Sequence, residues 1–286
     1  MKRVQLGFKA FDLHELACHF VAETAGFYAE RGLHVSLLDT RPVPDSELPQ
    51  DLFSAACGSA LFRWLRGEKL KVVLVAAERP MFWLYAHSDV AGLGDLEGRP
   101  VATYPDAAPP AQFLRIILND AGFQPGHEVP LIPERDDRGR LQLLRSGQAA
   151  AALISSAMLP SQVEALGFRQ LLCVGDRLRL PTTGLAVGSD TFQRCPDTVD
   201  AMRDSHRSAL RLVHGDEPAL RRALRDSGLV DVRHLDNACE LIQEFFTTDG
   251  RVPAAGILDG VRCIADSLTL RIPAEQAELY DCIREG

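Results

Sequence analysis

Short apolar runs alternate with amphipathic stretches through the first 190 residues of the chain. Residues 4–8 alternate in the manner of a half-buried strand, and residues 13–31 place Leu16, Phe20 and Ala25 on one face of a helix. Further strands are expected at 33–38, 70–77, 82–87, 129–132, 149–154, 170–174 and 184–187, and residues 95–104 are expected to form a tight turn that leads into a new strand. Further helices are expected at 59–66, 107–121, 141–146 and 159–166. This alternation predicts parallel sheets covered by helices.

The pattern changes after Pro196 and becomes helical almost to the end of the chain. Helices are expected at 196–214, 217–227, 234–247, 254–267 and 273–284. An amphipathic helix has to bury its apolar face, so this tail is expected to cover one of the sheets.

Composition narrows the class of protein. A chain of 286 residues exceeds the usual size of one domain, so two domains are expected. The net charge is −8 and no run of Lys and Arg occurs, which argues against nucleic-acid binding. The seven cysteines are odd in number and widely spaced, which argues against a disulfide framework and a zinc site and favours a reducing compartment. No motif predicts a cofactor.

The first residues run directly into the first predicted strand. They lack the apolar segment of a secretory signal, and no run is long enough to span a membrane. We therefore expect a cytoplasmic protein without membrane insertion, or a periplasmic one if a leader has been removed.

Four stretches resemble the type II periplasmic-binding-protein superfamily, in the branch of sulfonate-, taurine- and nitrate-binding proteins and thiamine-pyrimidine synthase-like proteins. They are residues 20–35 (FVAETAGFYAERGLHV), 51–73, 93–102 (LGDLEGRPVA) and 144–153 (LRSGQAAAAL). Ala150 stands where the superfamily has an acidic residue, and the Cys-rich segment of the pyrimidine synthases is absent, which argues against that activity.

The resemblance implies a two-lobed α/β fold with a hinge, two crossing strands near residues 87 and 187, and an interlobe cleft. The first lobe would be 1–87 plus 188–286, with the helical C-terminal region packed on it, and the second lobe 88–187. The ligand would lie at the carboxyl ends of strands and at helix N-termini.

Three loops of the first part of the chain are candidates for this cleft. Phe11, Asp12 and His14 follow the first strand, where Asp12 could instead cap the helix that begins near Leu13. Cys57, Gly58 and Ser59 open a helix, so their amides and hydroxyl suit an anion, although a plain Ser cap is the alternative. Arg79 follows the strand 70–77 and could clamp an acid, and Phe82 or Trp83 could stack on a ring, the alternative being a surface Arg and a core Trp.

Two loops of the second lobe are also candidates. Tyr104 and Asp106 follow its first strand, with Asp106 as a helix cap the alternative. Ser155 and Ser156 end the strand 149–154, so their hydroxyls are expected at the cleft.

Thiol chemistry is a further hypothesis, since some enzymes of this superfamily use a cysteine near the N-terminus. His14 and Cys18 share a helix face, and Cys57 at a helix N-terminus is expected to have a depressed pKa. A buried structural cysteine is the alternative.

Two functions follow from these observations. The first is a solute-binding-type protein for a small anionic or heteroaromatic metabolite, with an ABC permease as partner if it is exported. The second is a cytoplasmic enzyme on the same fold, such as a decarboxylase, desulfinase, lyase or cofactor-biosynthesis synthase. A homodimer is left open.

Overall fold

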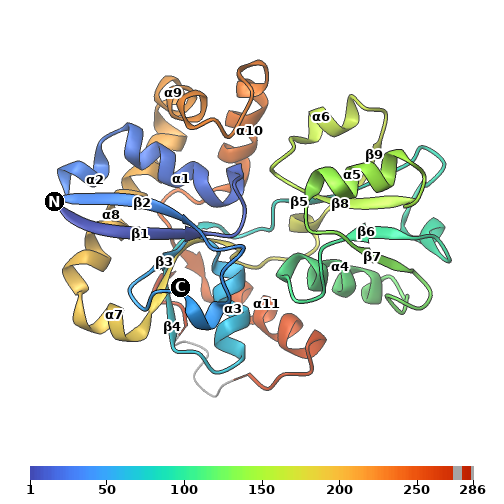
Figure 1. Ribbon diagram of the computed structural model, residues 1–286, viewed down its shortest axis with the longest axis horizontal. Helices are drawn as coiled ribbons and strands as arrows, with labels where there is room; N and C mark the ends of the chain where they lie inside the picture. The colour runs from blue at the N-terminus through green and yellow to red at the C-terminus, as the bar shows by residue number, and fades with distance from the viewer. Residues whose placement is uncertain (273–278, 285–286) are drawn as a thin grey trace. The chain divides into compact units, whose positions relative to one another are not determined.

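The computed structural model describes residues 1–272 and 279–284, and the chain divides into two compact units (Figure 1). The first unit contains Met1–Glu78, Leu180–Leu258 and Ile272–Gly286, and the second contains Arg79–Arg179 and Asp259–Arg271. Each unit is built around its own five-stranded sheet. The α/β class expected from the alternating pattern is confirmed.

The sheet of the first unit has the order β2-β1-β3-β10-β4. Its strands are β1 (Lys2–Phe8), β2 (Leu33–Asp39), β3 (Phe53–Ser54), β4 (Leu70–Ala77) and β10 (Thr183–Gly188). Strands β1, β2 and β3 are parallel, and β10 runs antiparallel to both β3 and β4, so the first four strands point the same way. Their carboxyl ends therefore share one edge with the beginning of β10.

Helices cover both faces of this sheet. The connections β1 to β2 and β3 to β4 run in opposite directions across the sheet, and right-handed crossovers then place α1 and α3 on opposite faces (Figure 1). α1 packs against α8 and α9, and α3 packs against β10 and β4. The helices are α1 (Leu13–Thr24), α2 (Phe27–Glu30), α3 (Cys57–Leu65), α7 (Ser189–Arg194), α8 (Pro196–Gly215), α9 (Glu217–Ser227) and α10 (Leu235–Phe245), with 3-10 turns η1 (Asp45–Glu47) and η4 (Val232–His234).

The sheet of the second unit has the order β7-β6-β8-β5-β9. β6 is parallel to β7 and β8, whereas β5 is antiparallel to β8 and β9. The strands are β5 (Phe82–Ala86), β6 (Val101–Thr103), β7 (Leu131–Pro133), β8 (Ala151–Ser155) and β9 (Arg169–Cys173). Around them lie α4 (Pro109–Asp120), α5 (Asp137–Arg145), α6 (Pro160–Glu164), η2 (Leu93–Leu96) and η3 (Val174–Asp176).

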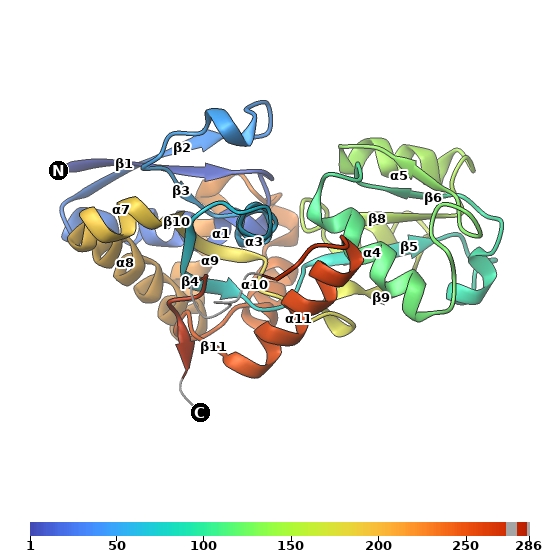
Figure 2. The same cartoon turned by 90° about the horizontal axis from the view of Figure 1, so that it is seen from below.

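The remaining elements belong to the C-terminal part of the chain. α11 (Ala254–Ser267) begins in a segment of the first unit and ends in one of the second, and β11 (Val252–Pro253) pairs with β12 (Ile283–Arg284) (Figure 2). α8, α9 and α10 belong to the first unit, and α8 packs against both α1 and β4, so the expected covering role of the helical tail is confirmed there.

Two predicted helices differ from the structure. The helix expected at 13–31 is two helices, because Gly26 adopts a φ of +77°, a left-handed conformation that ends the regular helix. The helix expected at 273–284 lies partly outside the described residues, and its described end contains β12 in place of a helix, since Ile283 pairs with Val252.

The boundaries of the compact units differ from the predicted boundaries of the lobes. Strand β5 precedes residue 87 and yet pairs with β8 and β9 in the second unit, and β10 precedes residue 187 and yet pairs with β3 and β4 in the first. The chain passes between the units just before β5 and just before β10, and twice more in the C-terminal part, at 258/259 and 271/272. The predicted hinge and cleft stay predictions.

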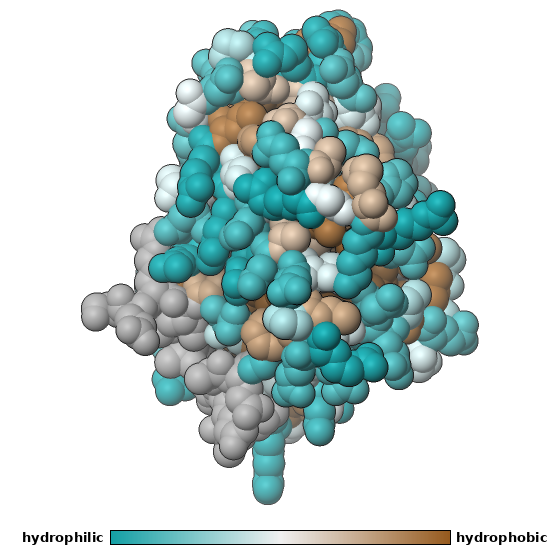
Figure 3. Space-filling model, turned by 90° about the vertical axis from the view of Figure 1, so that its left-hand side faces the viewer, coloured by the Kyte–Doolittle hydropathy of each residue, from teal (hydrophilic) through white to brown (hydrophobic). Residues whose placement is uncertain are grey.

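One face of the first unit is mainly polar (Figure 3). The face turned to the viewer in Figure 3 carries hydrophilic side chains with small, separate hydrophobic patches. Among the described residues, no helix combines the length and the apolar character that a membrane span requires.

Candidate functional site

The strand ends of the first unit bring several predicted residues to one edge of its sheet. Phe11 and Asp12 follow β1, and Cys57, Gly58 and Ser59 follow β3 at the start of α3. Thr182 reaches the same edge because it precedes the antiparallel strand β10. Such an edge of a mostly parallel sheet is where α/β proteins bind their ligands.

Asp12 begins α1 as its N-cap. Its carboxylate accepts a hydrogen bond from the amide of Glu15 at 2.9 Å, and the residue is buried. The capping alternative considered from the sequence is therefore confirmed. His14, in the first turn of the same helix, shares a hydrogen bond of 2.7 Å between its Nε2 and the Thr182 hydroxyl. Burial lowers the pKa of His14 to about 3, so its imidazole is neutral at pH 7.

Phe11 presents an aromatic surface at this edge. It is 45% exposed and is one of the few large hydrophobic side chains at the surface of the described chain. Its ring packs edge-on against Phe8 and Phe20, with centroid distances of 5.9 and 6.1 Å. These contacts hold the ring in place while leaving part of it accessible, which suits stacking on a flat ligand.

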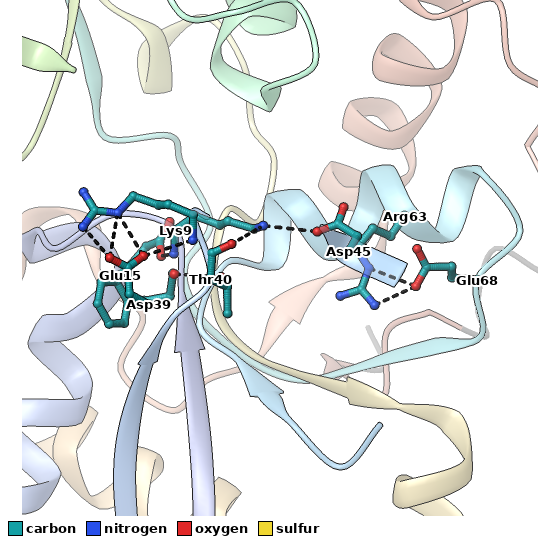
Figure 4. A network of polar contacts seen from close by, with 9 residues as sticks. Lys9, Glu15, Asp39, Thr40, Asp45, Arg63 and Glu68 are labelled. Carbon is teal, nitrogen blue, oxygen red and sulfur yellow. Dashed lines mark hydrogen bonds and ion pairs between the residues drawn. The ribbon is translucent and has the colours of Figure 1, made fainter. Parts of the chain in front are cut away.

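Glu15 also lies at this strand-end edge, and the sequence analysis did not identify it. Its carboxylate accepts a hydrogen bond from the amide of Lys9 at 2.7 Å (Figure 4). A second hydrogen bond, from the amide of Ala10 at 3.1 Å, helps to fix the loop after β1. Burial, and next the nearby carboxylate of Asp12, raise its pKa to about 8. The spacing of Glu15 three residues after an Asp cap, typical of a capping box, is the signal that could have pointed to it.

The loop at Cys57 differs from the expected anion site. The amide of Cys57 donates to the carbonyl of Ala55 (3.1 Å) and that of Gly58 to the carbonyl of Thr182 (3.0 Å), so neither N–H is free. The Cys57 thiol is buried, 3.9 Å from the Leu74 carbonyl oxygen. Burial raises its pKa well above the ordinary value, so the expected depression is wrong. Ser59, half-buried at the third residue of α3, stays a candidate.

Cys18 is equally unsuited to act as a thiolate. It is buried in α1 with its Sγ 3.6 Å from the carbonyl oxygen of His206, and burial raises its pKa far above the ordinary value. A nucleophilic cysteine requires the opposite environment. The geometry of both thiols is that of structural cysteines, and all seven cysteines of the chain are free.

The second unit has a comparable edge at its own strand ends. Tyr104 follows β6, Ser155 ends β8, and Phe82 begins β5 beside them, because β5 pairs Phe82 with Ser155. The Phe82 ring contacts Tyr104 at 5.7 Å and Phe113 at 6.2 Å, both edge-on. An aromatic cluster of Phe82, Tyr104 and Phe113 thus lies at this edge. The ligand contacts expected of Phe82 and Tyr104 stay predictions.

A buried arginine supports that cluster. The guanidinium of Arg140 lies 3.6 Å from the centre of the Tyr104 ring and is fully buried. It donates to the carbonyls of Leu153 (2.6 Å) and Glu134 (2.7 Å) and forms an ion pair with Asp137. These bonds satisfy a charge that would otherwise be costly to bury. Sequence reasoning did not identify Arg140 or Asp137.

The remaining predicted residues of this unit have partners within it. The amide and hydroxyl of Ser155 both donate to Asp137 at 2.8 Å, and Ser156 is buried. Asp106 is exposed and pairs with Arg115 at 2.7 Å. It does not cap a helix, because α4 begins at Pro109 after Ala108. Arg79 pairs with Asp176 at 3.2 Å.

Known structures share this architecture. The chain aligns over 100% of its length with 94% of the periplasmic aliphatic sulphonate binding protein SsuA from Escherichia coli, with a TM-score of 0.77 and 11% identity. A protein of Bordetella bronchiseptica RB50 covers 98% of this chain and 94% of its own length, with a TM-score of 0.76 and 18% identity. The desulfurization enzyme DSZB covers 97% of this chain and 96% of its own length, with a TM-score of 0.72 and 14% identity.

These comparisons identify the fold. The chain is a two-lobed α/β protein with the fold of the periplasmic binding proteins. The resemblance noted in the four sequence stretches, to the superfamily that includes sulfonate- and nitrate-binding proteins, is thereby confirmed at the level of the fold. No protein-family model and no curated protein sequence matches the chain. Proteins with the same fold can have different functions, so the function has to be inferred from the residues of the site.

Proposed function

We propose that this protein binds a small anionic or heteroaromatic metabolite at the strand-end edge of its first unit. The observation that carries the proposal is Phe11, an exposed aromatic ring held by Phe8 and Phe20 at the carboxyl end of β1. Three proteins of the same fold are an aliphatic sulphonate-binding, an alkanesulfonate-binding and a nitrate-binding protein, which supports a small anion as ligand.

The neighbouring polar groups suit such a ligand. The neutral imidazole of His14 and the hydroxyl of Thr182 form one hydrogen-bonded pair, and Ser59 lies at the start of α3, where the helix dipole favours negative charge. Phe11 would stack on an aromatic or planar group. Of the second unit, Arg79, Phe82, Tyr104, Asp106, Ser155 and Ser156 stay predicted ligand contacts. Ser155 is the weakest candidate among them, because its hydroxyl already donates a hydrogen bond to the carboxylate of Asp137.

An enzyme on the same fold is the second candidate, and the similarity to the desulfurization enzyme DSZB favours it. Catalysis by Cys18 or Cys57 is disfavoured by their burial and raised pKa values. Glu15, whose pKa is raised to about 8, is the described group at this edge that could exchange a proton near pH 7. A permease partner, a homodimer and a cytoplasmic location remain predictions from the sequence.

The test begins with the ligand that the protein retains. Small molecules are released from the purified protein by denaturation and identified by mass spectrometry, and the identified compound is titrated back by calorimetry. Phe11→Ala is expected to weaken its binding by about tenfold or more, because the stacking surface is lost. Val232→Ala removes another exposed hydrophobic side chain of the first unit, 63% exposed, and serves as the matched control.

Two outcomes would count against the proposal. Equal affinities of the Phe11→Ala variant and the Val232→Ala control would place the ligand elsewhere. Turnover of the retained compound by the wild-type protein, lost in Glu15→Gln, would favour the enzyme.

A further inference from the structure

A second concave site lies in the first unit, beside α3. Its volume is about 310 Å³, within the range of small-molecule pockets. Five buried apolar residues of the sheet, of α3 and of the segments beside them form its floor, while polar and charged groups make up most of the rest of its lining. These floor residues are Leu52, Ala60, Leu70, Ala186 and Val187. The volume equals that of about ten water molecules, which fits a compact organic molecule.

Hydrogen bonds and ion pairs fasten each wall of this pocket. Thr191 donates to the carbonyl of Gln50 (3.1 Å), and the amide of Ser189 donates to the carbonyl of Lys69 (3.0 Å), so α7 is tied to two neighbouring segments. Gly188 approaches the same Gln50 carbonyl so closely that an added Cβ would lie 3.2 Å from it. The walls therefore leave little freedom to collapse, and a pre-formed pocket binds with less ordering cost.

Two ion pairs hold the remaining walls (Figure 4). Lys9 bonds to Asp45 on η1 at 3.1 Å, and Arg63 of α3 bonds to Glu68 through Nε and Nη2, at 2.9 and 2.6 Å. The charges of these four side chains are balanced within the protein. They frame the pocket without offering a net charge to a ligand.

Lys69 and Asp190 differ from the other charged residues of the rim. Their backbone segments adjoin, since the Lys69 carbonyl accepts from the residue before Asp190. Both side chains are exposed, and within the part of the chain that the structure describes neither has an ion-pair partner. One ammonium and one carboxylate thus stand on the same rim above an apolar floor.

We propose that this pocket binds a small zwitterion of the apolar amino-acid class. The acid group of such a ligand would pair with Lys69, its ammonium group with Asp190, and its hydrocarbon part would occupy the apolar floor. Opposite charges on ligand and protein would be matched one to one, and the hydrocarbon would displace water from the floor. The site is separate from the edge at Phe11 and does not depend on the function proposed for that edge.

The test is calorimetric titration of the full chain with leucine as the probe. Leucine is expected to bind, while N-acetyl-leucine, which lacks the ammonium, and leucinamide, which lacks the carboxylate, bind at least about tenfold more weakly. Lys69→Ala and Asp190→Ala should each weaken leucine binding by a similar factor. The matched controls are Lys71→Ala and Asp197→Ala, which change residues of the same types outside the pocket lining.

A further variant separates the two sites. Phe11→Ala is expected to leave leucine binding unchanged. Three results would overturn the proposal: no binding at millimolar leucine, equal affinity for leucine and both blocked analogues, or affinity that Lys69→Ala and Asp190→Ala leave unchanged while their circular dichroism remains native.

Discussion

Arg140 lies directly beneath the ring of Tyr104, with its guanidinium carbon 3.6 Å from the ring centre and none of its side chain exposed. The same guanidinium joins α5 to the carbonyl of Leu153 in β8, so one side chain links a helix, a strand and a ring of the strand-end edge. A fully buried arginine is rare because its desolvation has to be offset by several partners at once.

Removal of this side chain is expected to destabilise the second unit strongly. Arg140→Met leaves Asp137 without its ion-pair partner and two carbonyls without a donor, and should lower the free energy of unfolding by about 3 kcal/mol. Urea unfolding followed by the fluorescence of Trp83, in a Trp64→Phe background, measures this. Arg138→Met on the exposed side of the same helix should change stability by less than about 0.5 kcal/mol. Equal effects of the two substitutions would contradict the interpretation.

Glu15 is expected to make stability depend on pH. Its pKa is raised from an ordinary value of 4.5 to about 8, so the folded protein holds a proton that the unfolded chain releases between these values. The stabilisation is complete below about pH 4.5 and is lost as the pH rises through 8. The difference in the free energy of unfolding between the wild type and Glu15→Gln should therefore fall by a few kcal/mol between pH 5 and 8.5, since each unit of pKa shift corresponds to about 1.4 kcal/mol.

Glu23 serves as the control, because its effect on stability should depend on pH in the opposite direction. The hydrogen bond from His19 lowers the pKa of Glu23, so its contribution is present above the ordinary Glu pKa and is lost on acidification. Urea unfolding of Glu15→Gln and of the control Glu23→Gln at several pH values distinguishes the two pH dependences. A wild type and a Glu15→Gln variant with parallel pH profiles would show that Glu15 titrates normally.

The buried thiols are expected to resist alkylation in the native protein. Cys18 and Cys57 combine burial with a raised pKa, whereas Cys195 and Cys263 are partly exposed. Iodoacetamide at pH 8 followed by peptide mass spectrometry should label Cys195 and Cys263 long before Cys18 and Cys57, and denaturation should abolish the difference. Early labelling of Cys18 or Cys57 would revive the thiol-enzyme hypothesis.

Gly184 is expected to tolerate no side chain. It lies at a bulge between β10 and β4 with a φ of +155°, and an added Cβ would lie 2.0 Å from the carbonyl oxygen of Leu74. Gly184→Ala should cost at least about 2 kcal/mol, because a backbone atom has to move. Gly94→Ala, where the Cβ meets open space, is the control and should be near neutral in thermal unfolding.

The sequence predicted the elements of the fold well where local pattern decides them. The alternation of strands and helices and the cap at Asp12 depend on side chains a few residues apart, and the structure has both. The break at Gly26 was missed because the apolar face continues across it. Pairing between distant strands fixed where the chain passes between the units, and no local pattern reports such pairing.

The site was predicted less completely for a related reason. Phe11 was identified because it follows the first strand, but Glu15 and Arg140 become special only through partners elsewhere in the chain. Arg140 bonds to a carbonyl 13 residues away, and the amides of the Cys57 loop are occupied partly by Thr182. Sequence reveals which groups a loop carries, and tertiary partners decide which of them stay available to a ligand.

The position of β10 in its sheet has a consequence for biosynthesis. β10 separates β3 from β4, and it follows the whole 79–179 segment in the chain. The second sheet can therefore form on the ribosome as soon as β9 has emerged, while β4 still waits for its neighbouring strand. A nascent chain stalled before residue 183 would carry an apolar β4 without its β10 neighbour, and such an unpaired strand is prone to aggregation until β10 is synthesised.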